Sequence, residues 1–542
     1  MSPIQPKGTQ KVRQYFLSNV AGTFASRIFG FLREVVVGGV FGASQATDVF
    51  VVAFTIPTLF RRVLGEDMVE RALLPSFKAL IEQGKKKEAW NLISRLGNLM
   101  MLALLVTMAL CYLGAHQLVA FIAPGLDAKS TAIAIKLTYI ILPFMVFIGL
   151  YALLGGMLLF LEEVNAFAFS PIMLSVGVIA VVPFFADRFG AQSLAAGFLV
   201  GGILQALFCV PFLFRQRLRR KYEPQYTPSI AVSGPRMRIV GRETFWITLS
   251  AVAVKAVDIV DRILASHLPE GSISSLYFAD RLNELPLAIL GLTLARAVLP
   301  PLTDAAARSD MRDFTATLIK GLRYNVLLVI PVSMLAMALS LPIVKLVYQR
   351  AAFDETDARM TALALICYAS GLLGLTAYNL LTRSFSALIH NRAAVLVSLA
   401  GMVLTITLKA LLVRTSLVHG GLALATSISF TGMSAVLLFS VRRMIKNRGS
   451  ALVLSEIFHP LAAALFAGAC AGIAAYLVFK FTQFYTFGAL RFHWFDINIL
   501  IDLMIATAIG IAVYSILLSV MGISEIRTVI RGMVKRVRKQ QT

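Results

Sequence analysis

Apolar stretches long enough to cross a lipid bilayer recur along the whole 542-residue chain. The hydrocarbon core of a bilayer is about 30 Å thick, and about 20 helical residues are needed to cross it. Hydrophobic residues make up 58% of the chain and charged residues only 15%, which excludes a soluble globular protein. The apolar runs lack the alternation of a barrel strand, so the sequence predicts an all-α polytopic membrane protein.

Lysine and arginine gather in the connections on one side of the predicted membrane, together with both termini. We expect about 14 spans, near residues 14–41, 47–80, 95–121, 130–160, 165–186, 192–214, 243–266, 272–306, 314–347, 358–389, 393–413, 420–441, 455–480 and 497–521. The positive-inside rule then places both termini in the cytoplasm. We expect the basic stretches 215–221 and 527–539 to bind anionic lipid headgroups. Nucleic-acid binding is not expected, because no soluble domain is left to carry it.

The chain contains an internal repeat. The segment "ERALLPSFKALIEQGKKKEAWNLISRLGNLM" aligns with "ARAVLPPLTDAAARSDMRDFTATLIKGLRYNVL", so that Pro75 matches Pro300. Each half holds an even number of spans, which predicts two parallel six-helix lobes and the geometry of an alternating-access transporter. The predicted division is residues 1–214 for the first lobe, 215–242 for a basic cytoplasmic linker, 243–441 for the second lobe, 442–521 for two further spans and 522–542 for a basic cytoplasmic tail.

Ionisable residues are concentrated in the first two spans of each half. The run "SRIFGFLREVVVGGVFG" carries Arg27, Arg33 and Glu34, and such charges cost several kcal/mol in lipid unless they face water or a partner. In the second half, the corresponding spans contain Lys255, Asp258, Asp261, Arg262, Asp280, Arg281, Glu284 and Arg296. The equivalence predicts one polar cavity lined by both pairs of spans. The alternatives are solvated helix ends, or a self-satisfied cluster around Arg281.

The arginines indicate the chemistry of the cargo. A guanidinium group stays charged and presents a planar fork that matches phosphate oxygens. Four candidates, Arg27, Arg33, Arg61 and Arg281, therefore favour an anionic substrate such as a diphosphate. Arg27 and Arg33 point about 120° apart on an ideal helix, so we expect a bend at Gly30. Pro57 and Pro286 are expected to break the second and eighth spans at matching places.

The first 80 residues carry a specific family resemblance. The sequences "SRIFGFLREVVVGGVFGASQATDVFVVAFTIPTLFRR", "ALLPSF" and "YFADRLNELPLAILG" resemble the MurJ (MviN) family, the bacterial lipid II flippases of the multidrug/oligosaccharidyl-lipid/polysaccharide exporter superfamily. The resemblance implies that the cargo is the undecaprenyl-diphosphate-linked precursor of peptidoglycan, moved from the cytoplasmic to the periplasmic leaflet of the inner membrane. It also implies that residues 442–521 form a groove for the lipid tail.

The resemblance assigns roles to individual residues. It places the essential cavity arginines at Arg27, Arg33, Arg61 and Arg281, and the cavity-facing serines and acids at Ser26, Asp48, Ser274 and Glu284. Some relatives hold a sodium ion between the seventh, eleventh and twelfth spans, but here Lys409 stands where an amide ligand is expected. We predict that its ammonium group replaces the cation and pairs with Asp258 or Asp261. The alternative is that Lys409 extends to the outer interface.

Enzyme functions are less well supported by the sequence. The six histidines and four cysteines show no metal-ligand or disulfide spacing, and no Walker loop occurs, so we expect neither a cofactor nor a metal. A membrane enzyme that processes polyprenyl phosphates remains the alternative from another class. The closer alternative is a flippase for another undecaprenyl-diphosphate-linked oligosaccharide, of the O-antigen type. Other cell-wall synthesis proteins are candidate partners.

Overall fold

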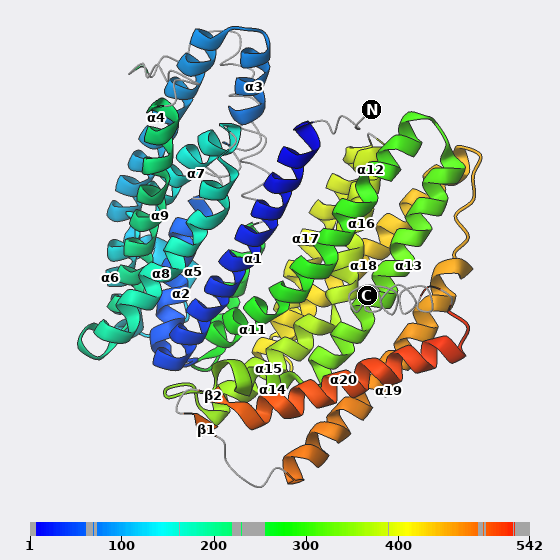
Figure 1. Ribbon diagram of the computed structural model, residues 1–542. Coiled ribbons are helices and arrows are strands. Elements are labelled where there is room, and N and C mark those ends of the chain that lie inside the picture. The colour runs from blue at the N-terminus through cyan, green and yellow to red at the C-terminus, as the bar shows by residue number, and fades with distance from the viewer. Residues whose placement is uncertain are drawn as a thin grey trace. The chain divides into compact units, whose positions relative to one another are not determined.

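The chain folds into two compact helical units. The structure is a computed structural model, and it describes residues 7–60, 69, 73–161, 163–218, 229, 255–388, 390–485, 491–492, 495–523 and 525. Unit 1 comprises residues 1–274 and 351–353, and unit 2 comprises residues 275–350 and 354–542 (Figure 1). The predicted linker 215–242 and tail 522–542 lie almost entirely outside the described residues.

Unit 1 contains the first nine helices. They are α1 (Lys7–Phe41), α2 (Gln45–Phe60), α3 (Leu74–Glu82), α4 (Lys86–Leu113), α5 (Ala115–Ile122), α6 (Ala128–Ile141), α7 (Phe144–Phe160), α8 (Val164–Phe189) and α9 (Gln192–Leu218). Helical residues 255–265 also belong to this unit, and the N–H of Gly125 donates to the Ser266 hydroxyl at 3.0 Å. The compact unit therefore reaches past the repeat boundary predicted from the sequence.

Unit 2 contains the remaining elements. They are α11 (Ser272–Pro286, whose first residues belong to unit 1), a π-helical segment (Leu287–Leu292), α12 (Thr293–Ala307), α13 (Met311–Ala338), α14 (Ser340–Tyr348), α15 (Glu355–Ser370), α16 (Leu372–Ala387), α17 (Asn391–Leu412), α18 (His419–Asn447), α19 (Ser455–Tyr485), β1 (Arg491–Phe492), β2 (Phe495–Asp496) and α20 (Ile497–Val520). The two strands pair antiparallel just before α20.

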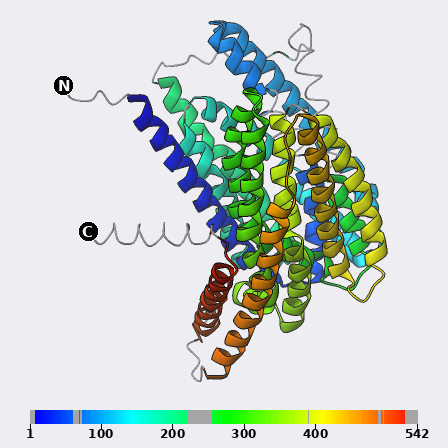
Figure 2. The same cartoon turned by 90° about the vertical axis from the view of Figure 1, so that its right-hand side faces the viewer.

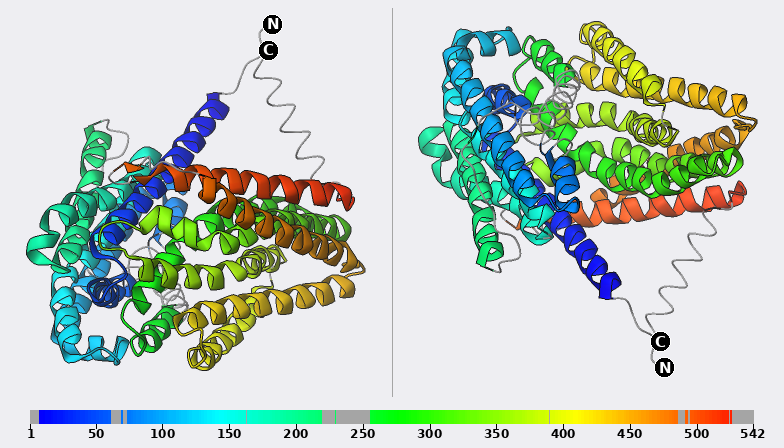
Figure 3. Two further views of the ribbon diagram at one scale, coloured as in Figure 1. Left: turned by 90° about the horizontal axis from the view of Figure 1, so that it is seen from below. Right: turned by 90° about the horizontal axis from the view of Figure 1, so that it is seen from above.

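The helix pairings of unit 1 recur in unit 2. In unit 1, α9 packs against α6, α7 and α8, while α4 packs against α3 and α7. In unit 2, α18 packs against α15, α16 and α17, while α13 packs against α12 and α16 (Figure 3). These two sets of partners occur in the same order along the chain, as the internal repeat predicts.

The turns of the two units also match in backbone conformation. Gly84 (φ 75°) and Ser309 (φ 57°) occupy corresponding turns, and so do Gly190 (φ 53°) and Val418 (φ 49°). Left-handed φ values are cheap for glycine but strained for a β-branched residue. Asp127, whose pKa is lowered by its hydrogen bond with Ser130, caps α6 in the same way as Asp354 caps α15.

The fourth span of unit 1 and the matching span of unit 2 are interrupted at equivalent positions. In unit 1, α6 ends at Ile141 and α7 begins at Phe144, with Pro143 between them. In unit 2, α15 and α16 are separated by Gly371 and bent by 41°. Matched interruptions are typical of transporters that rock two repeats against each other.

Ten described helical segments are long and apolar enough to cross a membrane, or eleven if the bent pair α15–α16 counts as one span. The number of fourteen stays a prediction. The predicted break at Pro57 is wrong within the described residues, because α2 continues through it to Phe60. At Pro286 the backbone changes from α11 to the π-helical segment, but Ser272–Ala307 remains one helical span, so the proline changes the helix type without breaking the span. The helix is not interrupted at Gly30, because α1 runs as one α-helix from Lys7 to Phe41.

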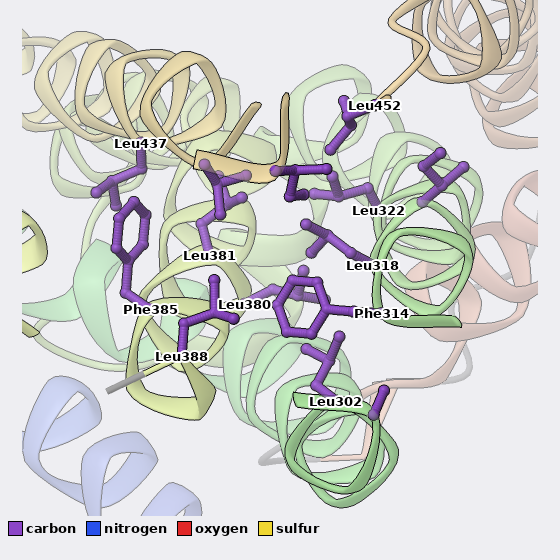
Figure 4. Packing of buried hydrophobic residues seen from close by; sticks show 14 of the residues in the cluster. Leu302, Phe314, Leu318, Leu322, Leu380, Leu381, Phe385, Leu388, Leu437 and Leu452 are labelled. Atoms are coloured by element: carbon purple, nitrogen blue, oxygen red, sulfur yellow. The ribbon is translucent and has the colours of Figure 1, made fainter. Parts of the chain in front are cut away.

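Three apolar clusters lie within the described part of unit 2, and the two larger ones connect most of its helices. The largest joins α12, α13, α16 and α18, and its Phe314 and Phe385 are fully buried (Figure 4). The second places α19 along α13 and α20 along α19, and the Tyr514 hydroxyl donates to the Leu327 carbonyl at 2.9 Å (Figure 2). The two helices outside the repeat are thus anchored on the first long helix of unit 2.

Candidate functional site

Arg33 lies between an acid and an aromatic ring in unit 1. Its Nε and Nη2 donate to Oε1 of Glu34 at 3.1 and 2.6 Å, and its guanidinium carbon is 5.1 Å from the ring centre of Phe198 on α9. Glu34 is buried, whereas 15% of the Arg33 side chain is exposed. One carboxylate oxygen therefore occupies the Nε–Nη2 edge, and the Nη1 end remains available to an anion.

Arg27 lies on a different side of α1. Six residues separate it from Arg33, which places the two side chains about 120° apart on the helix. Arg27 is exposed, and no ion pair or ring contact involves it within the described ranges. Ser26, its neighbour, is half-buried. The third predicted arginine of this lobe, Arg61, lies outside the described residues.

Arg281 of α11 has the same two kinds of neighbour in unit 2. Its Nη1 donates to Oε2 of Glu284 at 2.7 Å, and its guanidinium carbon lies 4.9 Å from the ring centre of Tyr277. Both neighbours are on its own helix, four residues before it and three after it. Arg281 and Glu284 are therefore paired on one helix, as the alternative of a self-satisfied cluster describes, but both side chains are partly exposed.

Asp48 and Ser274 are also brought together, but both are buried. The Asp48 carboxylate accepts the backbone N–H groups of Gly271 at 2.8 Å and Ser274 at 2.7 Å. These are among the amides that have no partner within α11, so Asp48 caps the N-terminus of this helix from α2. The geometry assigns Asp48 to the support of α11.

The second group of predicted charges is only partly connected. The Lys255 ammonium pairs with Asp258 one turn along the same helix, and Asp261 is half-buried. Lys409 of α17 is completely buried, which disagrees with a side chain extended to the outer interface. Its pairing with Asp258 or Asp261 stays a prediction.

Two residues that sequence reasoning missed shape these sites. Tyr277 is four residues before Arg281, so helical spacing could have found it. Phe198 is 165 positions from Arg33, and no local signal connects them.

No group of three or more histidine, cysteine, aspartate or glutamate side chains that could hold a metal ion occurs in the described ranges. Two repeated helical units with matched interruptions and with arginines inside the helices are typical of a membrane transporter. The fold agrees with this class. A solved inward-facing multidrug resistance MATE family transporter of the MOP superfamily matches with a TM-score of 0.65 at 14% identity, covering 80% of this chain and 98% of that one.

The family model "Lipid II flippase MurJ" matches residues 37–495, and the chain belongs to this family. The lipid II flippase MurJ of Burkholderia cenocepacia is 30% identical over 462 residues, covering 82% of this chain and 89% of that protein. The probable lipid II flippase MurJ of Rickettsia prowazekii is 31% identical over 422 residues, covering 75% and 79%. A solved lipid II flippase MurJ in an inward closed conformation matches with a TM-score of 0.74 at 24% identity, covering 94% and 99%. The chain is thus a multi-pass membrane transporter and not an enzyme.

Proposed function

We propose that this protein moves lipid II, the undecaprenyl-diphosphate-linked precursor of peptidoglycan, from the cytoplasmic to the periplasmic leaflet of the bacterial inner membrane by alternating access. Membership of the lipid II flippase family supports the substrate. One structural observation carries the proposal: each unit holds an arginine that is fixed by an acid and a ring and still partly exposed.

The diphosphate is the part of the substrate that arginine recognises best. Arg33 presents the guanidinium edge that Glu34 leaves unoccupied, and this edge can bind phosphate oxygens in a bidentate manner. Arg281, which is paired with Glu284 and partly exposed, is the corresponding candidate of the other lobe. Arg27, which is exposed, supplies a further cation, and Arg61 is the fourth candidate. In this mechanism the arginines of both lobes converge on one hydrated cavity that receives the sugars and the peptide.

The acids balance this attraction. Glu34 and Glu284 each neutralise part of one guanidinium charge, so the site binds a doubly negative group without retaining it. Asp48 contributes indirectly, because it holds the start of α11, the helix that carries Arg281. Ser26, which is half-buried, remains a candidate for a polar contact with the substrate, whereas Ser274 is buried at the start of α11, where its hydroxyl donates to the Gly271 carbonyl.

The remaining assignments follow from the charge distribution and the family. Both termini are cytoplasmic, the basic stretches 215–221 and 527–539 bind anionic lipids, and α19 with α20 accommodates the lipid tail. Other cell-wall synthesis proteins are candidate partners. The membrane potential is the favoured energy source, since it supplies about 2.3 kcal/mol per charge per 100 mV.

Sodium is not required in this proposal. Lys409 supplies the positive charge near Asp258 and Asp261 that a bound cation would supply elsewhere. Flux of lipid II into liposomes should therefore be the same in sodium and potassium buffers. Sodium-dependent flux that Asp258→Ala abolishes would contradict this part of the proposal.

Single arginine substitutions in cells depleted of their own lipid II flippase test the proposal. Arg33→Ala and Arg281→Ala should each fail to restore growth while they accumulate normally in the membrane. Lysine replacements should restore little growth, because an ammonium group lacks the planar fork. Arg188→Ala is the matched control, because Arg188 also stacks on a ring, that of Phe189 at 5.5 Å, but ends α8 away from these sites.

The same assay separates the alternative cargo. If the cargo is another undecaprenyl-diphosphate oligosaccharide, even the unsubstituted protein would leave the depleted cells unable to grow. It would instead restore surface display of that oligosaccharide in a strain that lacks the cognate flippase.

A further inference from the structure

Four phenylalanines form a compact aromatic cluster beneath Arg33 in unit 1. Phe198 of α9 lies 5.2 Å from Phe50 and 4.6 Å from Phe54, both on α2, and 6.4 Å from Phe144 at the start of α7, measured between ring centres. Phe50, Phe144 and Phe198 are at most 1% exposed. Phe198 thus contacts rings from two other helices, and its own ring also contacts the Arg33 guanidinium group.

We propose that Phe198 is a positioning residue that holds the Arg33 guanidinium in the orientation in which its Nη1 end meets a phosphate. This inference rests on the proposed function, because it concerns the same arginine. Phe198 itself does not contact the substrate. It acts through Arg33.

The geometry explains why the acid alone is insufficient. Glu34 contacts Arg33 through a single oxygen, Oε1, at both Nε and Nη2. A single acceptor atom fixes one edge of the guanidinium plane but leaves the plane free to tilt about that atom. The face of the Phe198 ring attracts the cation and limits this tilt, and the attraction is strongest where water is excluded. The Glu34 contact at the edge of the guanidinium group and the Phe198 contact at its face together define one orientation of that group.

The cluster also makes this support rigid. Gly202 lies one turn after Phe198 on α9, and a Cβ atom there would come within 2.7 Å of the Phe144 ring. The rings and the backbone are therefore packed without spare room, so Phe198 cannot change its rotamer alone. A side chain that is fixed in this way can preorganise the group it supports.

Binding of undecaprenyl diphosphate to the purified full-length protein in nanodiscs tests the proposal. Phe198→Leu and Phe198→Met keep an apolar side chain but remove the ring, and each should weaken binding roughly threefold to tenfold. Phe198→Tyr keeps the ring and should remain within about twofold of wild type. Phe208→Leu, a control on the same helix whose ring pairs with Phe212, should also remain within about twofold.

A double-mutant cycle distinguishes positioning from a general packing effect. In the Arg33→Ala background, Phe198→Leu should produce no further loss of binding, because the cation it positions is gone. An equal loss in both backgrounds, or wild-type binding by both ring-less variants, would overturn the proposal. If Arg33→Ala itself binds undecaprenyl diphosphate as wild type does, the proposed function fails at this arginine, which is a different result. Size-exclusion profiles and thermal unfolding identify any variant that misfolds.

Discussion

The interruptions of the two matching spans solve one backbone problem with different residues. In unit 1, Pro143 has no N–H, so the Tyr139 carbonyl four residues earlier loses its helical donor. The Tyr112 hydroxyl of α4 donates to that carbonyl at 2.8 Å. In unit 2 the equivalent carbonyl is that of Cys367, because the Gly371 N–H donates to Tyr368 instead, and the Ser427 hydroxyl of α18 donates to Cys367 at 2.6 Å.

This difference teaches that the repeat preserves backbone geometry and hydrogen-bond satisfaction while the residue types change. A carbonyl without a donor is costly in lipid, and at each interruption a hydroxyl from a neighbouring helix donates to the carbonyl that has lost its helical donor; in unit 2 the Ser370 hydroxyl of the same helix donates to it as well. Unit 1 uses a proline and a partly exposed tyrosine. Unit 2 uses a glycine whose position is crowded and a buried serine. The two interruptions should therefore respond differently to substitution.

The largest effect is expected at Gly371. A Cβ atom there would lie 2.3 Å from Cβ and 2.4 Å from Cα of Ser427, so the backbone of α18 would have to move. Gly371→Ala should lower the free energy of unfolding by about 2–3 kcal/mol, measured by denaturant titration in mixed micelles. Gly432→Ala on α18 is the control, since its nearest neighbour is 3.9 Å away, and it should be neutral or stabilising. Equal stability of both variants would contradict the crowding.

The second-largest effect is expected at the matched turns of Gly190 and Val418. Gly190→Val should lower the free energy of unfolding by about 1–2 kcal/mol, because φ 53° with ψ −137° is strained for a β-branched residue. Val418→Gly, at φ 49° and ψ −119°, should raise it by about 1 kcal/mol. Thermal unfolding of both variants measures the opposite signs. Shifts in the same direction would show that the two turns are not equivalent.

Removal of the buried serine should have a smaller effect. Ser427→Ala removes the 2.6 Å hydrogen bond to the Cys367 carbonyl, which keeps the Ser370 hydroxyl as a donor at 2.7 Å, and it should lower the free energy of unfolding by about 0.5–1 kcal/mol. The control Ser434→Ala removes an exposed hydroxyl that bonds within its own helix, and its stability should not change measurably. If Ser427→Ala and Ser434→Ala both have the free energy of unfolding of the wild type, the Cys367 carbonyl does not need the Ser427 hydroxyl.

The smallest effect is expected in unit 1. Tyr112→Phe removes the donor to the Tyr139 carbonyl, but this bond is exposed and not enclosed between helices, so its loss should cost less than the loss at the buried serine. We expect a loss below about 0.5 kcal/mol. Its ring stacks on Tyr139 at 5.6 Å and is kept by phenylalanine. A loss larger than that of Ser427→Ala would reverse the comparison between the two interruptions.

Most of the fold is readable from the sequence, because hydrophobic runs and the repeat determine which helices form and which pack together. Pro286 marks the change to π-helical structure, and prolines are visible in any sequence. The interruption at Gly371 carries no such local signal, since a helix can continue through glycine. Gly30 likewise gives no interruption, because α1 continues through it as one helix from Lys7 to Phe41.

Only part of the candidate site can be predicted from the sequence. The charges inside the spans identify Arg27, Arg33 and Arg281, and the spacing of three residues identifies the pair Arg281–Glu284. The aromatic ring beneath Arg33 could not be found, because Phe198 comes from a helix far along the chain. Asp48 is visible as an acid in the second span, but only packing reveals that it caps α11.

The most direct test of the central claim measures binding of lipid II to the purified wild type and to Arg33→Ala and Arg281→Ala, with Arg188→Ala as control. The probes are intact lipid II and the same lipid-linked muropeptide without its diphosphate. The account predicts that wild type and Arg188→Ala bind only the intact form tightly, and that each of the other substitutions removes this preference. Equal binding of both probes by wild type would contradict it.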